Sequence, residues 1–387
     1  METCFPHLFS PATIGSLSLK NRIVRSATYE AKADDTGGPT DLYLDFYRQL
    51  ARGGAGLIVT GLAYPEKEGK LPRTLGVDDI GCLPSLQRVA GAIHDVGNGC
   101  KVALQICHTG RQLPHSIDRQ TVAPSPIAEP YTGRTPRELS NGEIESFIDR
   151  SAAAIAYASQ AGFDAVQVHA AHGWLLSSFL SPHTNRRTDR FGGTTEKRAR
   201  ILIEIIERAK KRVSDDFPVL IKINACDYVE SGIDLPEALS IGTLLAEAGY
   251  AALEISSGMW ETITRDPKII GWKAERIPEA RKGIRTVKDE AYHRSFAKAF
   301  KERLKQIKII LVGGLKTPAL MDQIIAAGDA DLVALSRALI REPDLPNRWK
   351  DGSTEKAACI SCNKCLDTLR DENGLSCYYK DEQNQNR

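Results

Sequence analysis

His169 and His172 are separated by two alanines and close an apolar run that begins at Ala165. Imidazoles at this spacing could bind a metal, pack as a structural pair, or donate hydrogen bonds to an oxygen of a substrate. A metal site also needs a third ligand or a carboxylate at a usual spacing, and the sequence offers none. We therefore expect a polar pair that binds a substrate oxygen, with the packed structural pair as the alternative.

Lys222 lies within the apolar run Val219–Asn224. A lysine in a buried strand could form a Schiff base with a carbonyl substrate, as in aldolase-type enzymes. It could instead be a fixed positive charge beside an anionic cofactor. The pattern of residues leaves both chemistries open.

Two turns of small residues follow apolar runs late in the chain, at Gly313-Gly314 and at Ser336-Arg337. Backbone N–H groups in such turns bind phosphate when the turns lie at neighbouring strand ends, and an arginine adds a charge-assisted contact. The alternative is that the glycines only permit tight turns. We expect a phosphate site.

Four of the nine cysteines gather near the C-terminus, at Cys359, Cys362, Cys365 and Cys377. The odd total and the close spacing argue against a secreted disulfide framework and favour a reducing compartment. The first three have the spacing that opens a bacterial ferredoxin motif, and four thiolates also suit zinc. We expect one [4Fe–4S] cluster, with zinc or no metal as the alternatives.

Eight short apolar runs alternate with longer helical patterns. The expected strands are Ile23–Ser26, Gly56–Thr60, Val102–Ile106, Ala165–His169, Val219–Asn224, Ala252–Ser256, Ile309–Gly313 and Leu332–Ser336. The expected helices include Asp41–Arg52, Leu83–Val96, one capped by Ser140 and Glu143, Thr195–Val213, Leu235–Ala248, Asp289–Lys305 and Pro318–Ala327.

Such runs indicate parallel strands that are buried on both faces. Eight repeats favour a closed barrel over an open sheet, and Ser26-Ala27-Thr28 is not the glycine-rich turn of an open dinucleotide-binding sheet. We predict a (β/α)8 TIM barrel over residues 1–350, followed by a cysteine-rich tail over 351–387.

Three segments fall outside the repeat. Leu8–Lys20 is expected to form a hairpin, with its turn at Gly15-Ser16, that closes the bottom of the barrel. Met259–Lys288 is either a solvated surface loop or a lid over the site. The end of the tail, Asp381–Arg387, is expected to lack order.

Composition narrows the class of protein. The 387 residues carry a net charge of +2, mixed along the chain, which gives no reason to expect nucleic acid as a partner. Met1–Ile14 lacks the pattern of a secretory leader, and no run reaches the roughly 20 apolar residues that span a bilayer. We expect a cytoplasmic homo-oligomer with no membrane partner.

Several motifs, in the right order, resemble those of the old yellow enzymes. They are Lys20–Thr28, Ala103–Arg111, Val168–Trp174, Phe179–Gly193, Leu311–Gly314 and Leu335–Arg337. The resemblance covers about Phe5 to Trp349.

This resemblance implies a bound FMN, NAD(P)H as hydride donor, and a small-molecule substrate whose alkene is conjugated to a carbonyl. It implies that His169 and His172 bind the electron-withdrawing oxygen of the substrate. It also implies contacts with the cofactor. Ala27, Thr28 and Gly61 would lie along the flavin, Gln105 would bind its pyrimidine edge, and Lys222 would be a nearby cation. The phosphate would be bound by Gly313, Gly314, Ser336 and Arg337.

Three positions depart from the family pattern. Lys222 stands where relatives often have Arg, so the positive charge is kept but the planar guanidinium group is lost. Trp174 replaces the common proton-donating Tyr, and an indole N–H is not a usable acid, so the proton must come from another group or from water. Tyr29 stands where relatives carry Cys or Thr.

The tail resembles the [4Fe–4S] segment of the dienoyl-CoA reductase and trimethylamine dehydrogenase branch. It has one residue fewer between the second and third cysteines, and the sequence lacks the extra nucleotide-binding domains of that branch. The indicated function is FMN-dependent reduction of an activated alkene. The alternatives are a dehydrogenase of the trimethylamine type, a subunit that passes electrons to a redox partner protein, and a Schiff-base aldolase that uses Lys222.

Overall fold

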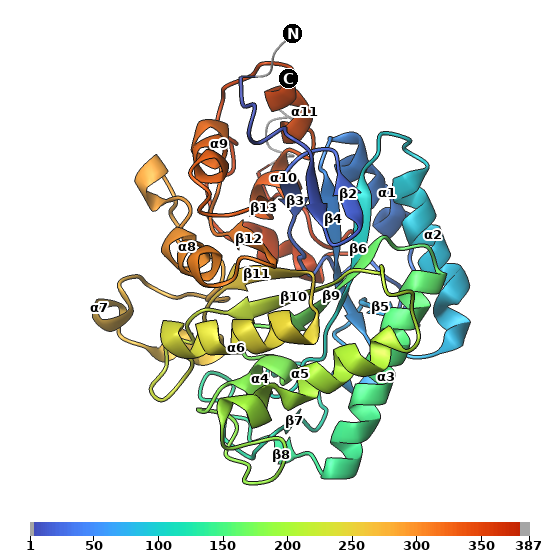
Figure 1. Ribbon diagram of the computed structural model, residues 1–387, viewed down its shortest axis with the longest axis vertical. Coiled ribbons are helices and arrows are strands. Elements are labelled where there is room, and N and C mark those ends of the chain that lie inside the picture. Colours follow the sequence, from blue (N-terminus) through green and yellow to red (C-terminus); the bar gives the residue numbers. More distant parts are fainter. Residues whose placement is uncertain (1–3, 380–387) are drawn as a thin grey trace.

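The computed structural model describes residues 4–379, and its centre is a closed barrel of eight parallel strands (Figure 1). The last strand pairs with the first, with Val333 opposite Ile23, and the first pairs with the second. The predicted (β/α)8 barrel is therefore confirmed. The strands in chain order are β3 (Ile23–Arg25), β4 (Leu57–Tyr64), β6 (Lys101–Ile106), β9 (Ala165–Ala170), β10 (Val219–Asn224), β11 (Ala252–Ser256), β12 (Lys308–Val312) and β13 (Leu332–Leu335).

Helices surround the strands on the outside of the barrel (Figure 1). They are α1 (Asp41–Arg52), α2 (Leu83–His94), α3 (Asn141–Gln160), α4 (Leu175–Leu180), α5 (Thr195–Lys210), α6 (Leu235–Ala248), α8 (Arg294–Arg303), α9 (Pro318–Ala326), α10 (Arg337–Arg341) and α11 (Leu345–Lys350). Local signals fix several of their ends. Ser140 and Glu143 form the expected capping box of α3, and Gly249 ends α6 in the left-handed region, at φ +100°.

The helices predicted over Leu83–Val96 and Pro318–Ala327 end one or two residues early, at His94 and Ala326. Two other predicted helices differ more from the observed ones. The helix expected over Asp289–Lys305 begins at Arg294, because the preceding residues form a 3-10 turn over Val287–Asp289. The helix that begins at Thr195 ends at Lys210 rather than at Val213. Neither change moves a strand end.

The N-terminal hairpin consists of β1 (Ala12–Ile14) and β2 (Leu17–Leu19), with Gly15 at its turn, at φ +56°. Ile14, Leu17 and Leu19 pack in one apolar cluster with the first residues of the barrel strands, such as Leu57. The hairpin therefore closes the amino-terminal end of the barrel, as predicted.

Long segments cover the carboxyl ends of the strands. Residues 112–139, for which the sequence predicted no element, carry a small parallel pair of β7 (Val122–Ala123) and β8 (Arg137–Glu138). A short strand, β5 (Leu75–Gly76), pairs with the end of β4. Residues 259–288 contain a 3-10 helix, Trp260–Thr264, and α7 (Pro267–Ile270).

Residues 259–288 are not a solvated loop along their whole length. Met259 and Thr262 are fully buried, and Gly283 N–H donates to the carbonyl of Ser361 in the tail. The segment thus lies between the strand ends and the tail.

The tail contains two 3-10 helices, Lys364–Leu366 and Thr368–Arg370, and contacts the loop after β3. Leu375 N–H donates to the carbonyl of Glu30, just after β3. The predicted lack of order over Asp381–Arg387 lies outside the described residues. Between residues 4 and 379, no helix is long and apolar enough to cross a membrane.

Candidate functional site

A chain of buried polar side chains crosses the inside of the barrel. Gln105 on β6 donates to Gln167 on β9 over 2.7 Å, and Gln167 donates to Glu254 on β11 over 2.8 Å. Ser26 donates to the other oxygen of Glu254 over 2.6 Å. All four residues are at most 2% exposed, so their hydrogen bonds fix their orientation in a medium without water.

Lys222 pairs with Glu254 inside this chain. Its Nζ lies 3.0 Å from Glu254 Oε1 and donates to Ser26 Oγ over 3.1 Å. The two residues stand opposite one another in the register of β10 and β11, and His169 stands opposite Lys222 on β9. Sequence reasoning missed Glu254, although a lone carboxylate in the apolar run Ala252–Ser256 was the available signal.

His169 and His172 lie together at the end of β9, with ring centroids 5.0 Å apart. Both are at most 5% exposed, and burial is the main reason that the pKa of each lies well below its ordinary value of 6.5. Both rings are therefore neutral at physiological pH. The N–H of Ala171 donates to His169 Nδ1 over 3.3 Å, which leaves the ring proton on Nε2.

His172 is held from several sides. Its Nε2 lies 2.6 Å from Ser256 Oγ, and its Nδ1 lies 3.6 Å from a carboxylate oxygen of Glu279. Its backbone N–H donates to Asn224 Oδ1 over 3.1 Å. The residue has φ +64°, a conformation that costs energy for a residue with a Cβ and that is common at functional sites.

Aromatic rings line one side of the histidine pair. The ring of Trp174 lies 6.2 Å from that of His169, and Trp260 lies 6.0 Å from Trp174. Trp174 is 8% exposed and joins an apolar cluster with Leu71 and Leu113. The histidines therefore border an apolar wall rather than open water.

Small and hydroxyl residues follow β3, and a glycine lies within β4. Ala27 follows β3, and Thr28 Oγ1 lies 2.7 Å from Ser336 Oγ beyond β13. The N–H of Gly61 donates to the hydroxyl of Tyr47 over 2.6 Å. A Cβ at Gly61 would overlap the carboxylate of Glu30, so only glycine fits this approach.

Gly313 and Gly314 form the turn after β12, at φ +150° and +69°. A Cβ at Gly314 would lie 2.9 Å from the ring of Tyr292. Arg337, at the start of α10, donates to the carbonyl of Arg281 over 2.8 Å and to Asn363 Oδ1 over 2.6 Å. Arg337 therefore links its own turn, which was predicted to bind phosphate, to the segment 259–288 and to the tail.

The four tail cysteines line a single hollow beside α10, together with Arg337 and Tyr378. Cys359, Cys362 and Cys377 all lie close enough to act on Cys365 electrostatically, and burial raises the pKa of the Cys365 thiol to about 11. In the part of the chain that the structure describes, no three His, Cys, Asp or Glu side chains lie close enough to share one metal ion. The cysteines are thus gathered but more widely spaced than the ligands of one ion.

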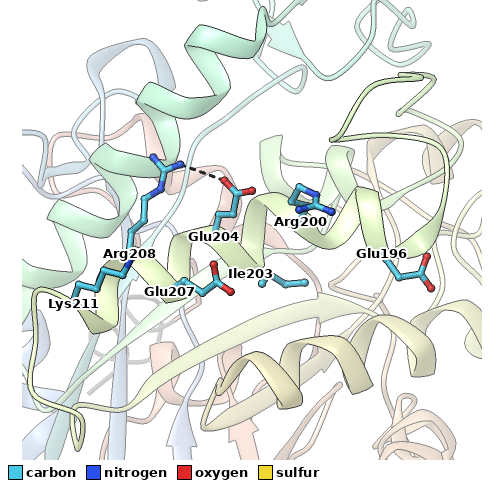
Figure 2. Close-up of a pocket in the computed structure, with 7 residues that line it drawn as sticks. All are labelled: Glu196, Arg200, Ile203, Glu204, Glu207, Arg208 and Lys211. Carbon is cyan, nitrogen blue, oxygen red and sulfur yellow. Dashed lines mark hydrogen bonds and ion pairs between the residues drawn. The ribbon is translucent and has the colours of Figure 1, made fainter.

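A second hollow runs along the outer face of α5, and Figure 2 shows Arg208 reaching Glu204 there, with the two charged groups 3.3 Å apart. Its other lining residues are Glu196, Arg200, Ile203, Glu207 and Lys211. None of them belongs to a strand end. We regard this hollow as a solvated groove of the helix surface.

The strand ends therefore bring most of the predicted residues into one region, and they also bring residues that the sequence analysis missed. The missed residues are Glu254 and Glu279, and each contacts a predicted residue. Ser256, which contacts His172, ends a predicted strand. Of the two missed residues, only Glu254 could have been found from the sequence, because Glu279 lies within a long irregular segment.

Comparison with known proteins places these features in a family. Residues 7–356 match the model of the NADH:flavin oxidoreductase / NADH oxidase family. The chain is 36% identical to the NADH oxidase of Thermoanaerobacter brockii over 371 residues, which cover 93% of this chain and 53% of that protein. It is 30% identical to the 4,4'-dithiodibutanoate disulfide reductase of Rhodococcus erythropolis, over 97% of this chain and 96% of that protein.

Among solved structures, 2-naphthoyl-CoA reductase superposes with a TM-score of 0.87 at 26% identity, over 97% of this chain and 57% of that one. The chain therefore spans about half the length of some proteins that it resembles and nearly the full length of the disulfide reductase.

Proposed function

Because this chain belongs to the NADH:flavin oxidoreductase / NADH oxidase family, we propose that it is an FMN-dependent oxidoreductase that uses NAD(P)H to reduce an activated alkene. The observation that carries the proposal is the neutral pair His169 and His172 at the mouth of the barrel, beside the cation Lys222. The substrate that this pair fits is a small molecule with a carbonyl conjugated to the alkene.

The donor set at the strand ends fits FMN. A flavin offers a pyrimidine edge with carbonyl oxygens and N–H groups, and the carboxamide of Gln105 and the ammonium of Lys222 are suitable partners for it. A phosphate accepts hydrogen bonds from backbone N–H groups, hydroxyls and arginine. Gly313 and Gly314 can supply the N–H groups, Ser336 the hydroxyl and Arg337 the guanidinium. Ala27 and Thr28 have small side chains that suit a flat ring beside them, and Gly61 would contact the ring through its backbone.

When bound, FMN supplies the hydride that is added to the β-carbon of the substrate. The residues of this chain act on the charge that then develops on the carbonyl oxygen. Since His169 carries its proton on Nε2, it donates to that oxygen without changing its own charge. Losing one such preplaced donor typically costs about 3 kcal/mol of transition-state stabilisation.

Cofactor identity tests the proposal directly. Flavin released by heat from the purified protein should run as FMN in chromatography, with one FMN per chain. FAD, or no flavin after reconstitution with FMN, would contradict the proposal. The choice between NADH and NADPH follows from the rate at which each reduces the bound flavin.

A second function, electron transfer through an iron–sulfur cluster, is favoured by the hollow that the four cysteines share. Each thiolate of a [4Fe–4S] cluster binds a different iron, so its ligands lie further apart than those of one zinc ion. Cys359, Cys362, Cys365 and Cys377 would hold the cluster. We treat residues 351–387 as a cluster segment distinct from the barrel of residues 1–350.

Metal analysis after anaerobic purification separates the alternatives. About four iron and four acid-labile sulfide per chain would support the cluster and an outlet to a redox partner protein. One zinc without sulfide would mean a structural site, and the proposed transfer of electrons to a partner protein would be wrong.

We also propose that the protein is a cytoplasmic homo-oligomer. Size-exclusion chromatography with light scattering tests its assembly.

A further inference from the structure

Alkene reduction needs a proton at the α-carbon, and Trp174 cannot supply it. We propose that Glu279, from the segment after β11, donates this proton. The inference rests on the proposed function, because it assigns the second half of the same reaction. Nothing in the strand pattern pointed to Glu279, since it lies 23 residues beyond the end of β11, at Ser256.

The position of the Glu279 carboxyl group is the first observation. Its Oε1 lies 3.6 Å from His172 Nδ1, so the group reaches the residue that we assign to the substrate oxygen. Its Oε2 is enclosed and has no hydrogen-bond partner among residues 4–379. The α-carbon of an enone is bonded to the carbonyl carbon, so an acid beside the carbonyl site is also beside the atom that needs the proton.

The backbone around Glu279 is held on both sides, which is the second observation. Tyr292 donates from its hydroxyl to the carbonyl of Glu279 over 2.8 Å. Asn363 donates to the carbonyl of Ala280 over 2.6 Å, and Arg337 binds the next carbonyl, that of Arg281. A catalytic group must be placed to within a fraction of an ångström, and three anchors on successive carbonyls meet that need.

The charged groups around Glu279 set its protonation. Lys222 from β10 and Arg337 from α10 each favour the carboxylate, whereas His172 is neutral and the Tyr292 hydroxyl is uncharged. Desolvation by burial outweighs both cations and raises the pKa of Glu279 to about 7. The group therefore holds its proton below neutral pH, which suits a general acid.

The step balances without a further reagent. The hydride adds to the β-carbon, and the electrons of the C=C bond move to the carbonyl oxygen to give an enolate. The α-carbon then takes the proton of Glu279, and the carboxylate that remains is reprotonated by water. In sum, the alkene and NAD(P)H with one proton give the saturated product and NAD(P)⁺.

The test compares Glu279→Gln with Glu275→Gln, a control on the same segment whose carboxylate binds the exposed Lys273 and Lys282. In anaerobic stopped flow, reduction of the flavin by NAD(P)H should keep its rate in both variants. Reoxidation by an enone should slow about 100-fold or more in Glu279→Gln and stay unchanged in Glu275→Gln. In the unsubstituted protein, that reoxidation should slow as the pH rises through about 7.

A nitroalkene substrate distinguishes a role of Glu279 in protonation from a role in hydride transfer. Hydride addition to a nitroalkene gives a stable nitronate anion that needs no proton. Glu279→Gln should still reduce the nitroalkene and release the nitronate. Infrared titration gives a readout apart from activity: a protonated carboxyl band that fades near pH 7 should lose intensity in Glu279→Gln. Glu279→Asp should keep part of the enone rate.

Two outcomes would overturn the proposal. One is an enone rate in Glu279→Gln within threefold of that of the unsubstituted protein. The other is an equal loss with enone and nitroalkene, which would mean that Glu279 supports hydride transfer rather than protonation. If the unsubstituted protein reduces neither acceptor, the proposed function fails instead, so the two failures are distinguishable.

Discussion

Replacing either partner of the buried pair Lys222–Glu254 should destabilise the barrel strongly, and replacing both should cost less free energy than the sum of the two single replacements. Lys222→Met leaves the Glu254 carboxylate without its cation, and Glu254→Gln leaves the ammonium without its anion. Both side chains are at most 6% exposed, so water cannot compensate for the lost partner. The double replacement removes both charges together.

The magnitude follows from the separation of 3.0 Å between Nζ and Oε1. At an effective dielectric constant of about 20, two unit charges at that distance attract by about 6 kcal/mol, and desolvation offsets a large part. We expect each single replacement to cost about 3–5 kcal/mol. The double-mutant cycle should give a coupling free energy of about 2–4 kcal/mol.

Urea unfolding of the flavin-free protein, followed by circular dichroism, measures these free energies. A coupling free energy below about 0.5 kcal/mol would refute the view that the two charges depend on one another. Redox titration adds a functional readout. Glu254→Gln should raise the potential of the bound flavin, because the cation near its pyrimidine edge is no longer neutralised.

Three further predictions concern other parts of the site. Arg337→Ala should weaken FMN binding by about 1–3 kcal/mol, as measured by fluorescence titration; unchanged affinity would remove Arg337 from the phosphate site. Trp174→Tyr should raise enone reduction, most of all in a Glu279→Gln background, because a phenol restores an acid; no gain in stopped flow would mean that the introduced phenol is not placed to donate. Burial raises the pKa of Glu30 to about 7 from an ordinary 4.5, so the folded protein holds this proton more tightly than the unfolded chain does. The stabilisation that the protonated Glu30 provides is full below about pH 4.5 and is lost as the pH rises through 7. Glu30→Gln should therefore stabilise the protein at pH 8 by up to about 3 kcal/mol in urea unfolding, and equal stability at pH 8 would contradict this.

The barrel could be predicted from the sequence because its strands are continuous apolar runs between capped helices. Val219–Asn224 and Ala252–Ser256 were predicted with the observed bounds, since both faces of each strand are buried. The grouping of His169 and Lys222 followed from the rule that parallel strands end at one side of a barrel. Their roles remain predictions.

The residues that contact them, Glu254 and Glu279, could not be predicted from the sequence in the same way. Glu254 meets Lys222 only because the register of two strands places them opposite one another, and register depends on the closed barrel. Glu279 reaches His172 from an irregular segment whose path is set by contacts with Tyr292 and Asn363, far apart in the sequence. Irregular segments lack the periodicity that makes strands and helices readable.

The central claim is that a neutral histidine pair stabilises charge on the oxygen of an alkene substrate. The measurement that tests it most directly is the anaerobic reoxidation of the reduced, FMN-bound protein by an enone, in the unsubstituted protein and in His169→Ala and His172→Ala. We predict that the enone reoxidises the flavin, and that each variant keeps its flavin and lowers the second-order rate about 100-fold or more. Full reoxidation rates in both variants would contradict the account.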